Sequence, residues 1–365
     1  MQCGVCSMII DELNSKHIPV EDVSYGAAEK KYIVTMRNPG MCSCGGHATK
    51  TGPSAFRKIL DLEKDELITL HIALTRYRCN QCSRYMFSAD MDAWELIMPE
   101  YKLCSDEATV YLIRKMLARP GFRYEDIAEE FGVSAGGVCK TFRGFLEEVR
   151  QKIIPLIPSQ QIILHPIKHR RITEICVFGA DSSGHTGLQD IIQPDQVGPY
   201  FEWLNHLKRF NPPKRIACDF KQQQELLTMT LDPSTELVLT DEALAEFQWY
   251  ITEKFGEDFV SQIRELGYCE KQLKRLCETI PVKRRGRNFA LIDEIYRYAF
   301  AYHNRCTYDA EYVKATIKQI ETLKTRKYDN TVILLWLMFT SSLHRDALLN
   351  TKYAKYVINE ENSPS

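Results

Sequence analysis

The sequence predicts a multidomain α+β protein with an N-terminal zinc ribbon, a helical helix-turn-helix domain, and an α/β domain with C-terminal helices. Three observations carry this prediction: close cysteine pairs flank a β-rich stretch, a helix-turn-helix spacing follows, and short β-like runs then alternate with helical segments. The predicted domains are residues 1–95, 96–158 and 159–350, with a helical insertion at 242–308 and a tail at 351–365.

Length and composition fit several globular domains in one chain. At 365 residues the chain exceeds what one hydrophobic core usually serves, and 44% apolar with 26% charged residues is an ordinary globular mixture. The net charge of −1 excludes a uniformly basic nucleic-acid coat but permits a local basic face. The longest apolar run, residues 332–339, is too short to span a membrane, and residues 1–4 do not resemble a secretory signal. We therefore expect a cytoplasmic protein with no membrane partner.

Thirteen cysteines indicate metal binding rather than disulfides. In a reducing compartment paired cysteines more often bind metal, and an odd number fits poorly with a closed disulfide framework. Seven of the cysteines are scattered singly after residue 100. The other six form three close pairs: Cys3/Cys6, Cys42/Cys44 and Cys79/Cys82.

The segment between the second and third pairs is typical of a zinc ribbon. Residues 56–62 and 67–77 are candidate strands, and two cysteine turns joined by antiparallel strands bring four thiolates around Zn²⁺. Gly45 and Gly46 would let backbone amides approach the sulfurs. We therefore predict a structural Zn²⁺ site with the ligands Cys42, Cys44, Cys79 and Cys82.

The ligand set stays open at this point. The spacing Cys42-x-Cys44 is tighter than the usual Cys-x-x-Cys turn, so Cys3 and Cys6 are counted as further candidate metal ligands. Alternatively, His47 could replace a strained cysteine, or the cysteines could be buried free thiols. A closed four-ligand site would support folding rather than catalysis.

Residues 101–150 are predicted to be helical and contain the spacing of a DNA-binding helix-turn-helix. Ala128 is small enough for two helices to cross, and Gly132, four residues later, can adopt the left-handed turn conformation. Val133 and Val138 would fill the shared core. The alternative is an ordinary helical hairpin.

The second helix of this motif would face the DNA groove. Gly136 and Gly137 in its first turn would permit a close approach of the backbone to phosphate. Segment 101–170 carries 11 Lys/Arg and 8 Asp/Glu, a modest positive excess that favours DNA. The predicted DNA-binding residues are Ser134, which also caps this helix, Lys140, Thr141 and Arg143.

After residue 159 the pattern predicts a mixed α/β sheet. A helix is expected at residues 200–208, and nearly everything from 242 to 349 is helical in pattern. Asp219 and Asp241 each end a predicted strand, where α/β sheets usually place their sites. The five predicted strands are residues 162–164, 172–178, 188–192, 215–219 and 236–240.

The order of these parts resembles the ISL-three family of bacterial insertion-sequence transposases over roughly residues 40–345. Residues 42–46, and residues 76–82 together with Phe87, look like the two halves of that family's zinc ribbon, and residues 128–138 look like its helix-turn-helix. The resemblance implies a ribonuclease-H-like domain whose Asp-Asp-Glu triad holds two Mg²⁺ or Mn²⁺ ions for phosphoryl transfer. It implies a partner, double-stranded DNA at the ends of a mobile element, and we expect a homodimer.

Two acids of that triad have counterparts in this chain. Asp219 matches the family's second acid, and Glu311 stands in place of the closing Glu, although the Gly and Asn that normally follow are missing. Asp241 matches the acid that ends the next strand, but Leu244 stands where the family usually has His.

The first acid has no direct counterpart, because His165 occupies its position. Asp181 is the only nearby replacement, although residues 179–184 are also typical of a hairpin turn. A neutral imidazole adds no charge to a site for a hard cation, and Mg²⁺ depends on carboxylate oxygens. Either Asp181 completes the site in another register, or the domain is catalytically impaired.

A second positively charged segment lies late in the chain. Residues 271–330 contain 14 Lys/Arg and 7 Asp/Glu, including the predicted DNA-binding residues Lys283, Arg284, Arg285 and Arg287. Such a run is usually a solvated face, but beside a helix-turn-helix it favours phosphate contact. Three functions therefore stay open: an active transposase, a transposase-derived DNA-binding or regulatory protein, and a zinc-ribbon protein without a nucleic-acid role.

Overall fold

The computed structural model describes residues 8–24, 30–64, 66–88, 90–99, 102–119, 122–157, 160–169, 171–208, 212–226, 231, 234–266, 268–280 and 289–356. It divides into two compact units that meet between Val149 and Arg150, and each unit is described by itself. The predicted ribbon and nearly all of the predicted helix-turn-helix domain lie in the first unit.

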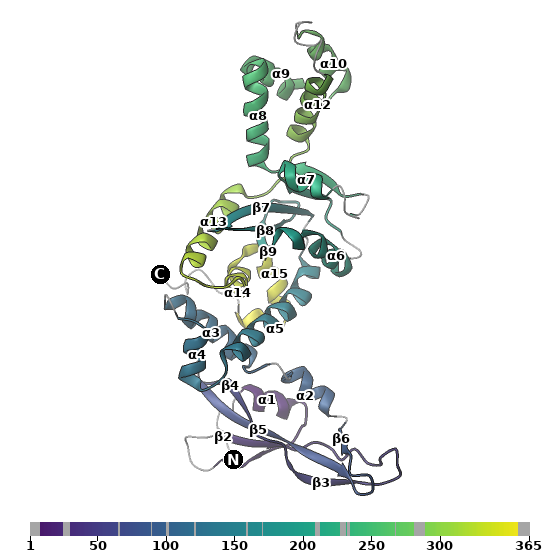
Figure 1. The fold of residues 1–365 in the computed structure, drawn as a ribbon, viewed down its shortest axis with the longest axis vertical. Helices are drawn as coiled ribbons and strands as arrows, with labels where there is room; N and C mark the ends of the chain where they lie inside the picture. The colour runs from purple at the N-terminus through teal and green to yellow at the C-terminus, as the bar shows by residue number, and fades with distance from the viewer. Residues whose placement is uncertain are drawn as a thin grey trace. The chain divides into compact units, whose positions relative to one another are not determined.

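The first unit combines a twisted sheet with helices (Figure 1). Its described elements are α1 (Met8–Ser15), β1 (Val20–Asp22), β2 (Lys30–Val34), β3 (Ala48–Pro53), β4 (Arg57–Glu63), β5 (Glu66–Cys79), β6 (Tyr85–Met86), α2 (Met91–Ile97), α3 (Asp106–Ala118), α4 (Tyr124–Phe131) and α5 (Ala135–Ile153).

The long strand β5 organises the sheet of the first unit. Its first part pairs with β4 in an antiparallel hairpin and with β2 in parallel, and its last part pairs antiparallel with β3 and β6. Strands β4 and β5 confirm the strands predicted at 56–62 and 67–77. Leu70 and Ile72 are two residues apart and therefore lie on the same face of β5. They pack with Leu13 of α1 and Trp94 of α2 in one buried core. Tyr77, near the end of β5, still belongs to this core. Residues 41–56 and 76–87, which contain the cysteine turns and are called the cysteine hairpin below, begin there.

The second unit consists of an α/β layer and a helical insertion. Its described elements include 3₁₀ turns at Ile154–Leu156, Pro194–Gln196 and Ala354–Tyr356. The strands and α-helices are β7 (Gln161–His169), β8 (Ile172–Ala180), β9 (Thr186–Ile192), α6 (Val197–Leu207), β10 (Arg215–Cys218), α7 (Phe220–Leu226), β11 (Glu236–Leu239), α8 (Asp241–Phe255), α9 (Glu257–Leu266), α10 (Glu270–Glu278), α12 (Phe289–His303), α13 (Ala310–Thr325), α14 (Asn330–Thr340) and α15 (Ser342–Leu349).

The sheet of the second unit has the strand order β11-β10-β7-β8-β9. Strands β7, β8 and β9 are successive antiparallel neighbours, whereas β10 is parallel to β7 and β11 is parallel to β10. All five strands predicted for this half are confirmed, but β7 continues to His169 where the sequence predicts an end at Leu164. Pro166 is tolerated inside β7 because β10 stops at Cys218, and among the described residues no other strand pairs with β7 on that side at Pro166.

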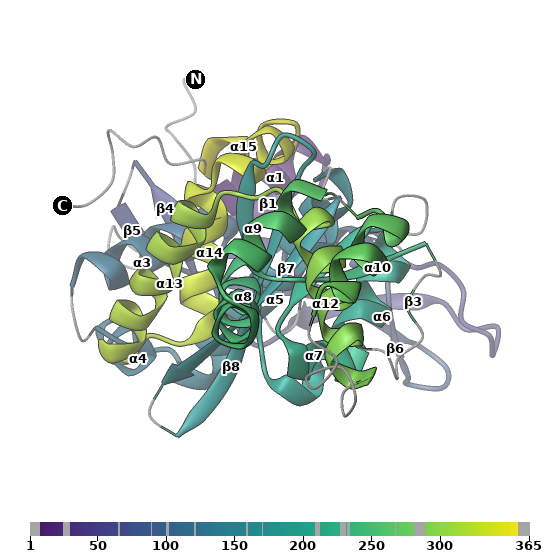
Figure 2. The same cartoon turned by 90° about the horizontal axis from the view of Figure 1, so that it is seen from above.

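Helices cover both faces of this sheet. On one face Tyr200, Phe201 and Leu204 of α6 pack against Ile162 and Leu164 of β7. Helix α13 contacts β7 and β9, and α14 and α15 contact β9. Figures 1 and 2 show α13 and α14 on one side of β7 and α6 on the other. His165 follows Leu164, so strand alternation turns its side chain to the face opposite α6.

Helices α8, α9, α10 and α12 form a helical insertion with a hydrophobic core of its own, which includes Phe247, Ile263, Leu273 and Tyr298. Tyr298 of α12 is fully buried there, so its ring serves packing. Among the described residues no single helix is long and apolar enough to cross a membrane. Only the bent pair α14 and α15 meets that test together, by length and composition alone.

Candidate functional site

Two chain turns bring four cysteines together at the end of the β3–β5–β6 hairpin. Cys42 and Cys44 lie in the turn before β3, Cys79 ends β5, and Cys82 lies in the turn that leads to β6. Ala48 pairs with Cys79 across the antiparallel β3–β5 ladder, so the first turn folds back over the second.

The spacing of the four sulfurs fits a tetrahedral metal site. The Sγ atoms of Cys42 and Cys82 are 3.7 Å apart, and those of Cys44 and Cys79 are 3.4 Å apart. All four Sγ atoms lie within 4.8 Å of one another. Zn–S bonds of about 2.3 Å in a tetrahedron require sulfurs about 3.8 Å apart. The four predicted cysteines are therefore brought together at metal-binding distance.

Two backbone N–H groups form hydrogen bonds with the Cys79 sulfur. The N–H groups of Gln81 and Cys82 each donate to Cys79 Sγ at 3.4 Å. The Cys82 amide is the largest influence that lowers the pKa of Cys79 to about 6. The two hydrogen bonds favour the thiolate form that a metal ligand must adopt.

The remaining candidate ligands do not join this cluster. His47 is exposed, and among the described residues the metal-binding group contains only the four cysteines. Cys3 and Cys6 lie outside the described residues. Burial does not account for the cluster as free thiols, because Cys44 and Cys82 are exposed.

Gly46 is required by the close approach of the two turns. A Cβ atom at this position would lie 2.5 Å from Cys79 Sγ and 2.8 Å from Asn80 Oδ1. The Asn80 side chain accepts the N–H of His47 at 2.9 Å and so ties the first turn to the second. The sequence indicates a role for Gly46 but not this contact.

We expect Gly46→Ala to weaken metal binding roughly 10- to 100-fold, the usual effect of disturbing groups around a metal ligand. The added methyl group must displace Cys79 Sγ or Asn80. Competition with a colorimetric zinc chelator would measure the change. Gly52→Ala is the matched control, because a Cβ there meets nothing within 4 Å. Equal metal affinity of the two variants would contradict the expectation.

Helices α4 and α5 are joined by a short turn at the predicted positions. Gly132 ends α4 in the left-handed conformation, with φ of 59°. Ser134 Oγ accepts the N–H of Gly137 at 3.1 Å and so caps α5. The shared core contains Val138, and the ring of Tyr124 packs edge-on against Phe142 at 5.4 Å between centroids.

The predicted DNA-binding residues on α5 separate into two groups. Ser134, Lys140 and Arg143 are exposed, and Gly136 has open space around it. Thr141, in contrast, is fully buried: its hydroxyl accepts the Leu103 N–H at 2.8 Å and donates to the Gly137 carbonyl at 3.0 Å. The expectation that Thr141 faces DNA is therefore wrong.

Gly137 also has a structural role that differs from the predicted one. A Cβ there would lie 2.2 Å from Leu103 Cδ1, so the glycine allows the chain at Leu103 to pack on α5. Gly136, in contrast, has nothing within 4 Å of an added Cβ and leaves the backbone open. The predicted cluster Lys283, Arg284, Arg285 and Arg287 lies outside the described residues.

In the second unit Asp219 lies beside His165. The β7–β10 register pairs Ala217 with Ile163, and two further residues bring Asp219 level with His165. Asp219 Oδ1 accepts the N–H of Gln222 at 2.8 Å and caps α7. Among the described residues no hydrogen bond to Asp219 Oδ2 is formed, which leaves that oxygen available to a ligand.

Asp181 lies at the other end of the same sheet. Strand β8 runs antiparallel to β7 and pairs Ala180 with Gln161, so Asp181 is about 16 Å along the strand from His165. Its carboxylate accepts the N–H groups of Ser183 and His185 at 2.8 and 3.0 Å within the β8–β9 turn. Burial acts to raise the pKa of Asp181, but these bonds and the His185 ring outweigh it and hold the pKa below its usual value. The structure does not bring Asp181 to Asp219.

Glu311 also lies away from Asp219. Helix α13 begins beside the start of β7, where the Asp309 N–H donates to Thr186 Oγ1 at 2.9 Å. It ends beside Glu174, which pairs with Lys324 and lies opposite Ile167. Glu311 sits in the first turn, and its side chain is 87% exposed. Glu321 is ten residues further along, about 15 Å towards the level of His165.

Two acids that the sequence reasoning missed lie near His165. Burial lowers the pKa of this histidine, and the negative charges of Glu242, Glu321 and Asp219 oppose that effect. Glu242 lies in the first turn of α8, directly after the predicted strand-end acid Asp241. Three carboxylates therefore lie within electrostatic range of His165, whereas the sequence predicts a different trio; among the described residues these acids do not form a group at metal-binding distance.

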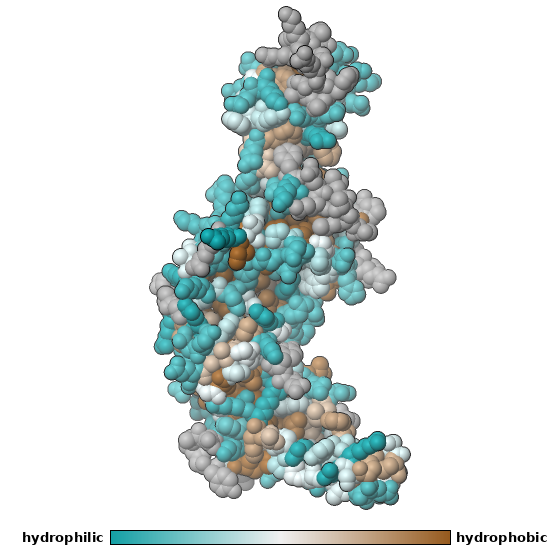
Figure 3. Space-filling model, in the orientation of Figure 1, coloured by the Kyte–Doolittle hydropathy of each residue, from teal (hydrophilic) through white to brown (hydrophobic). Residues whose placement is uncertain are grey.

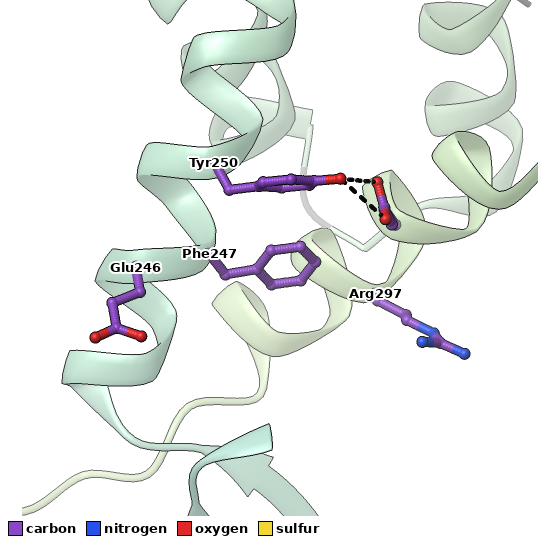
Figure 4. Close-up of a pocket in the computed structure, with 5 residues that line it drawn as sticks. Glu246, Phe247, Tyr250 and Arg297 are labelled. Carbon is purple, nitrogen blue, oxygen red and sulfur yellow. Dashed lines mark hydrogen bonds between the residues drawn. The ribbon is translucent and has the colours of Figure 1, made fainter. Parts of the chain in front are cut away.

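A separate hollow of about 310 Å³ lies in the helical insertion and is lined by Glu246, Phe247, Tyr250, Glu294 and Arg297 (Figure 4). The Tyr250 hydroxyl donates to the Glu294 carboxylate at 3.0 to 3.1 Å, which joins α8 to α12. Among the described residues its lining includes none of the residues predicted for catalysis or DNA binding.

The chain matches no model of a known protein family and no curated protein. The candidate sites are therefore judged on their own geometry.

Proposed function

We propose that the chain is a transposase-like protein that binds duplex DNA through α5 and uses Zn²⁺ to stabilise the cysteine hairpin. The observation that carries the proposal is the α4–α5 geometry, with a left-handed Gly132 turn and with Ser134, Gly136 and Lys140 exposed at the start of α5. Such helices insert their N-terminal residues into the major groove.

The exposed face of α5 has suitable chemistry for DNA. Gly136, Lys140 and Arg143 are spaced by four and three residues, so they share one helical face. The opposite face is occupied by the apolar core at Val138 and Phe142. Two cations beside an open helix N-terminus suit phosphate and base-edge contacts.

We expect Arg143→Ala and Lys140→Ala each to weaken duplex binding about tenfold, because each variant removes one cationic contact. Fluorescence anisotropy over a series of salt concentrations would also show a slope reduced by about 1 for a lost phosphate contact. Lys318→Ala, an exposed lysine on α13, is the matched control. Unchanged affinity in both α5 variants would reject α5 as the DNA-binding helix.

A second function, metal-dependent strand cleavage, is favoured by the acids around His165. Strand β7 is central, and its parallel neighbour β10 brings Asp219 beside it, as the proposed ribonuclease-H-like domain requires. Asp219, Glu242 and Glu321 are the residues that would hold Mg²⁺ or Mn²⁺, since hard cations prefer carboxylate oxygens. Among the described residues they are not grouped at metal-binding distance, so their side chains would have to move towards one another to share an ion. When bound, such an ion stabilises charge on the attacking and leaving oxygens.

His165 distinguishes this site from an all-carboxylate triad. Because burial lowers its pKa, the ring is neutral at neutral pH and can accept a proton. The third carboxylate that the sequence lacks at position 165 would then come from Glu242 or Glu321. If the site holds no ion, the alternative function is a DNA-binding or regulatory protein derived from a transposase.

A further inference from the structure

The cysteine hairpin carries two arginines and two aromatic rings on its outer strands. Arg78 pairs directly with Tyr85 across the antiparallel β5–β6 ladder. Tyr77 pairs with Met86, so the next step of the same register brings Arg76 opposite Phe87. We call these four residues, Arg76, Arg78, Tyr85 and Phe87, the arginine–aromatic face.

Alternation along the strands separates this face from the core. Tyr77 belongs to the core cluster of the first unit, and the partly buried Met86 packs against that cluster. Their neighbours in sequence therefore point to the opposite side. Tyr85 is 55% exposed and Phe87 is 78% exposed. In Figure 3 hydrophobic and hydrophilic atoms lie next to each other where Figure 1 draws β3 and β6.

The two arginines are arranged around an aromatic ring. Their guanidinium carbons lie 5.6 Å (Arg76) and 5.5 Å (Arg78) from the centroid of the Tyr85 ring, within the range of cation–π contact. Arg76 also donates to the Pro53 carbonyl at 2.9 Å, and Arg78 donates to the Ser83 carbonyl. These bonds hold the side chains in place without neutralising their charge.

The hairpin has positive charge and no acid. Residues 41–56 and 76–87 contain Lys50, Arg76, Arg78 and Arg84 but no Asp or Glu. Among the described residues none of these four cations forms an ion pair. By contrast, Arg37 in the same unit is paired with Asp90 at 2.6 Å. The hairpin thus presents four uncompensated charges beside two exposed rings.

We propose that the arginine–aromatic face binds unpaired bases of single-stranded DNA, with bases stacked on Tyr85 and Phe87 and phosphates contacted by Arg76 and Arg78. Exposed rings beside cations match the stacking and electrostatic contacts that such strands use. In a duplex the base faces are covered by their neighbours, so the rings select unpaired nucleotides. The choice of DNA rests on the proposed function, because opened strands arise wherever DNA ends are cut and joined.

The test measures binding of the full chain to a fluorescent single-stranded DNA of mixed sequence, about 16 nucleotides long, and to the corresponding duplex. We expect the double variant Tyr85→Ala/Phe87→Ala to bind the single strand roughly tenfold or more weakly, since each stack contributes substantially. Duplex affinity should change less than twofold, about 0.4 kcal/mol by RT ln 2. Trp249→Ala is the matched control, because Trp249 is an aromatic residue 64% exposed outside the hairpin.

Conservative variants separate stacking from folding. Tyr85→Phe keeps the ring and should keep affinity, whereas Tyr85→Leu keeps apolar bulk and should lose it; bound zinc in each variant verifies the hairpin. Equal affinity of Tyr85→Phe and Tyr85→Leu, or an equal loss for single strand and duplex, would overturn the stacking site. Equal binding of the same sequence as RNA would overturn the choice of DNA. Failure of Arg143→Ala to affect the duplex would reject the proposed function separately.

Discussion

Replacing Cys79 with serine is expected to abolish stoichiometric zinc binding and to unfold the cysteine hairpin. Cys79 Sγ accepts hydrogen bonds from two backbone N–H groups, and it lies 3.4 Å from Cys44 Sγ. A structural zinc contributes about 10–16 kcal/mol of apparent binding free energy, and a serine hydroxyl cannot replace the thiolate. The two turns are also joined by the mutual hydrogen bonds of His47 and Asn80, which contribute far less than metal ligation.

The loss of order should be local. The first part of β5, with Leu70 and Ile72, packs in the core against α1, whereas the part that ends at Cys79 supports the hairpin. Hydrogen exchange should therefore accelerate in residues 41–54 and 78–87 while residues 57–77, which include the core residue Tyr77, stay protected. Zinc analysis and exchange mass spectrometry measure both effects. Cys104→Ala is the control: this buried cysteine lies outside the cluster, so the variant should retain zinc.

A Cys79→Ser protein that keeps a full complement of zinc and an unchanged exchange pattern would contradict this expectation. Loss of zinc with unaltered exchange would mean that the hairpin is held by its strands rather than by the metal.

Local sequence patterns predict the turns and strands well because their causes are local. The Cys42/Cys44 and Cys79/Cys82 spacings predict the metal cluster, since each pair lies within one turn. The contact that makes Gly46 necessary joins it to Cys79, 33 residues away in the sequence, and no local pattern encodes it. The same reason explains Gly137, whose neighbour Leu103 lies before α3.

The error at Thr141 could have been avoided from the sequence. Val138, Phe142 and Phe145 follow one another at helical spacing and are all buried. Thr141 lies three residues after Val138 and four before Phe145, within that apolar stripe. Lys140 and Arg143 fall on the outer side, so the phase of the helix separates the residues that face outward from those that face inward.

The misplaced acids have a different origin. Asp181 and Asp219 each follow a strand, but β8 runs against β7 and carries Asp181 to the opposite end, while parallel β10 carries Asp219 towards His165. Strand order and direction depend on pairing between distant segments, so the identity of a strand-end acid does not say which edge it occupies. For Glu311 the missing information is where α13 crosses the sheet.

Asp219→Asn and Glu321→Gln are each expected to reduce metal-dependent DNA cleavage by roughly a hundredfold or more, because each removes a negative charge from the proposed cation site. The substitutions preserve shape, and the amide oxygen that replaces the Asp219 carboxylate oxygen can still cap α7. Nicking of an inverted-repeat duplex with Mg²⁺ or Mn²⁺ would provide the measurement. The chain offers two matched controls, Asp181→Asn and Glu311→Gln, since both acids lie at the other end of β7.

These four variants distinguish the acids near His165 from those predicted by the sequence. Loss of cleavage in the controls, with full activity in the Asp219 and Glu321 variants, would reject the proposed site. Absence of cleavage by the unaltered protein with either metal, while it still binds the duplex, would favour the DNA-binding protein without catalysis. In that case His165 is the decisive difference, because a neutral ring stands where an active triad needs a carboxylate.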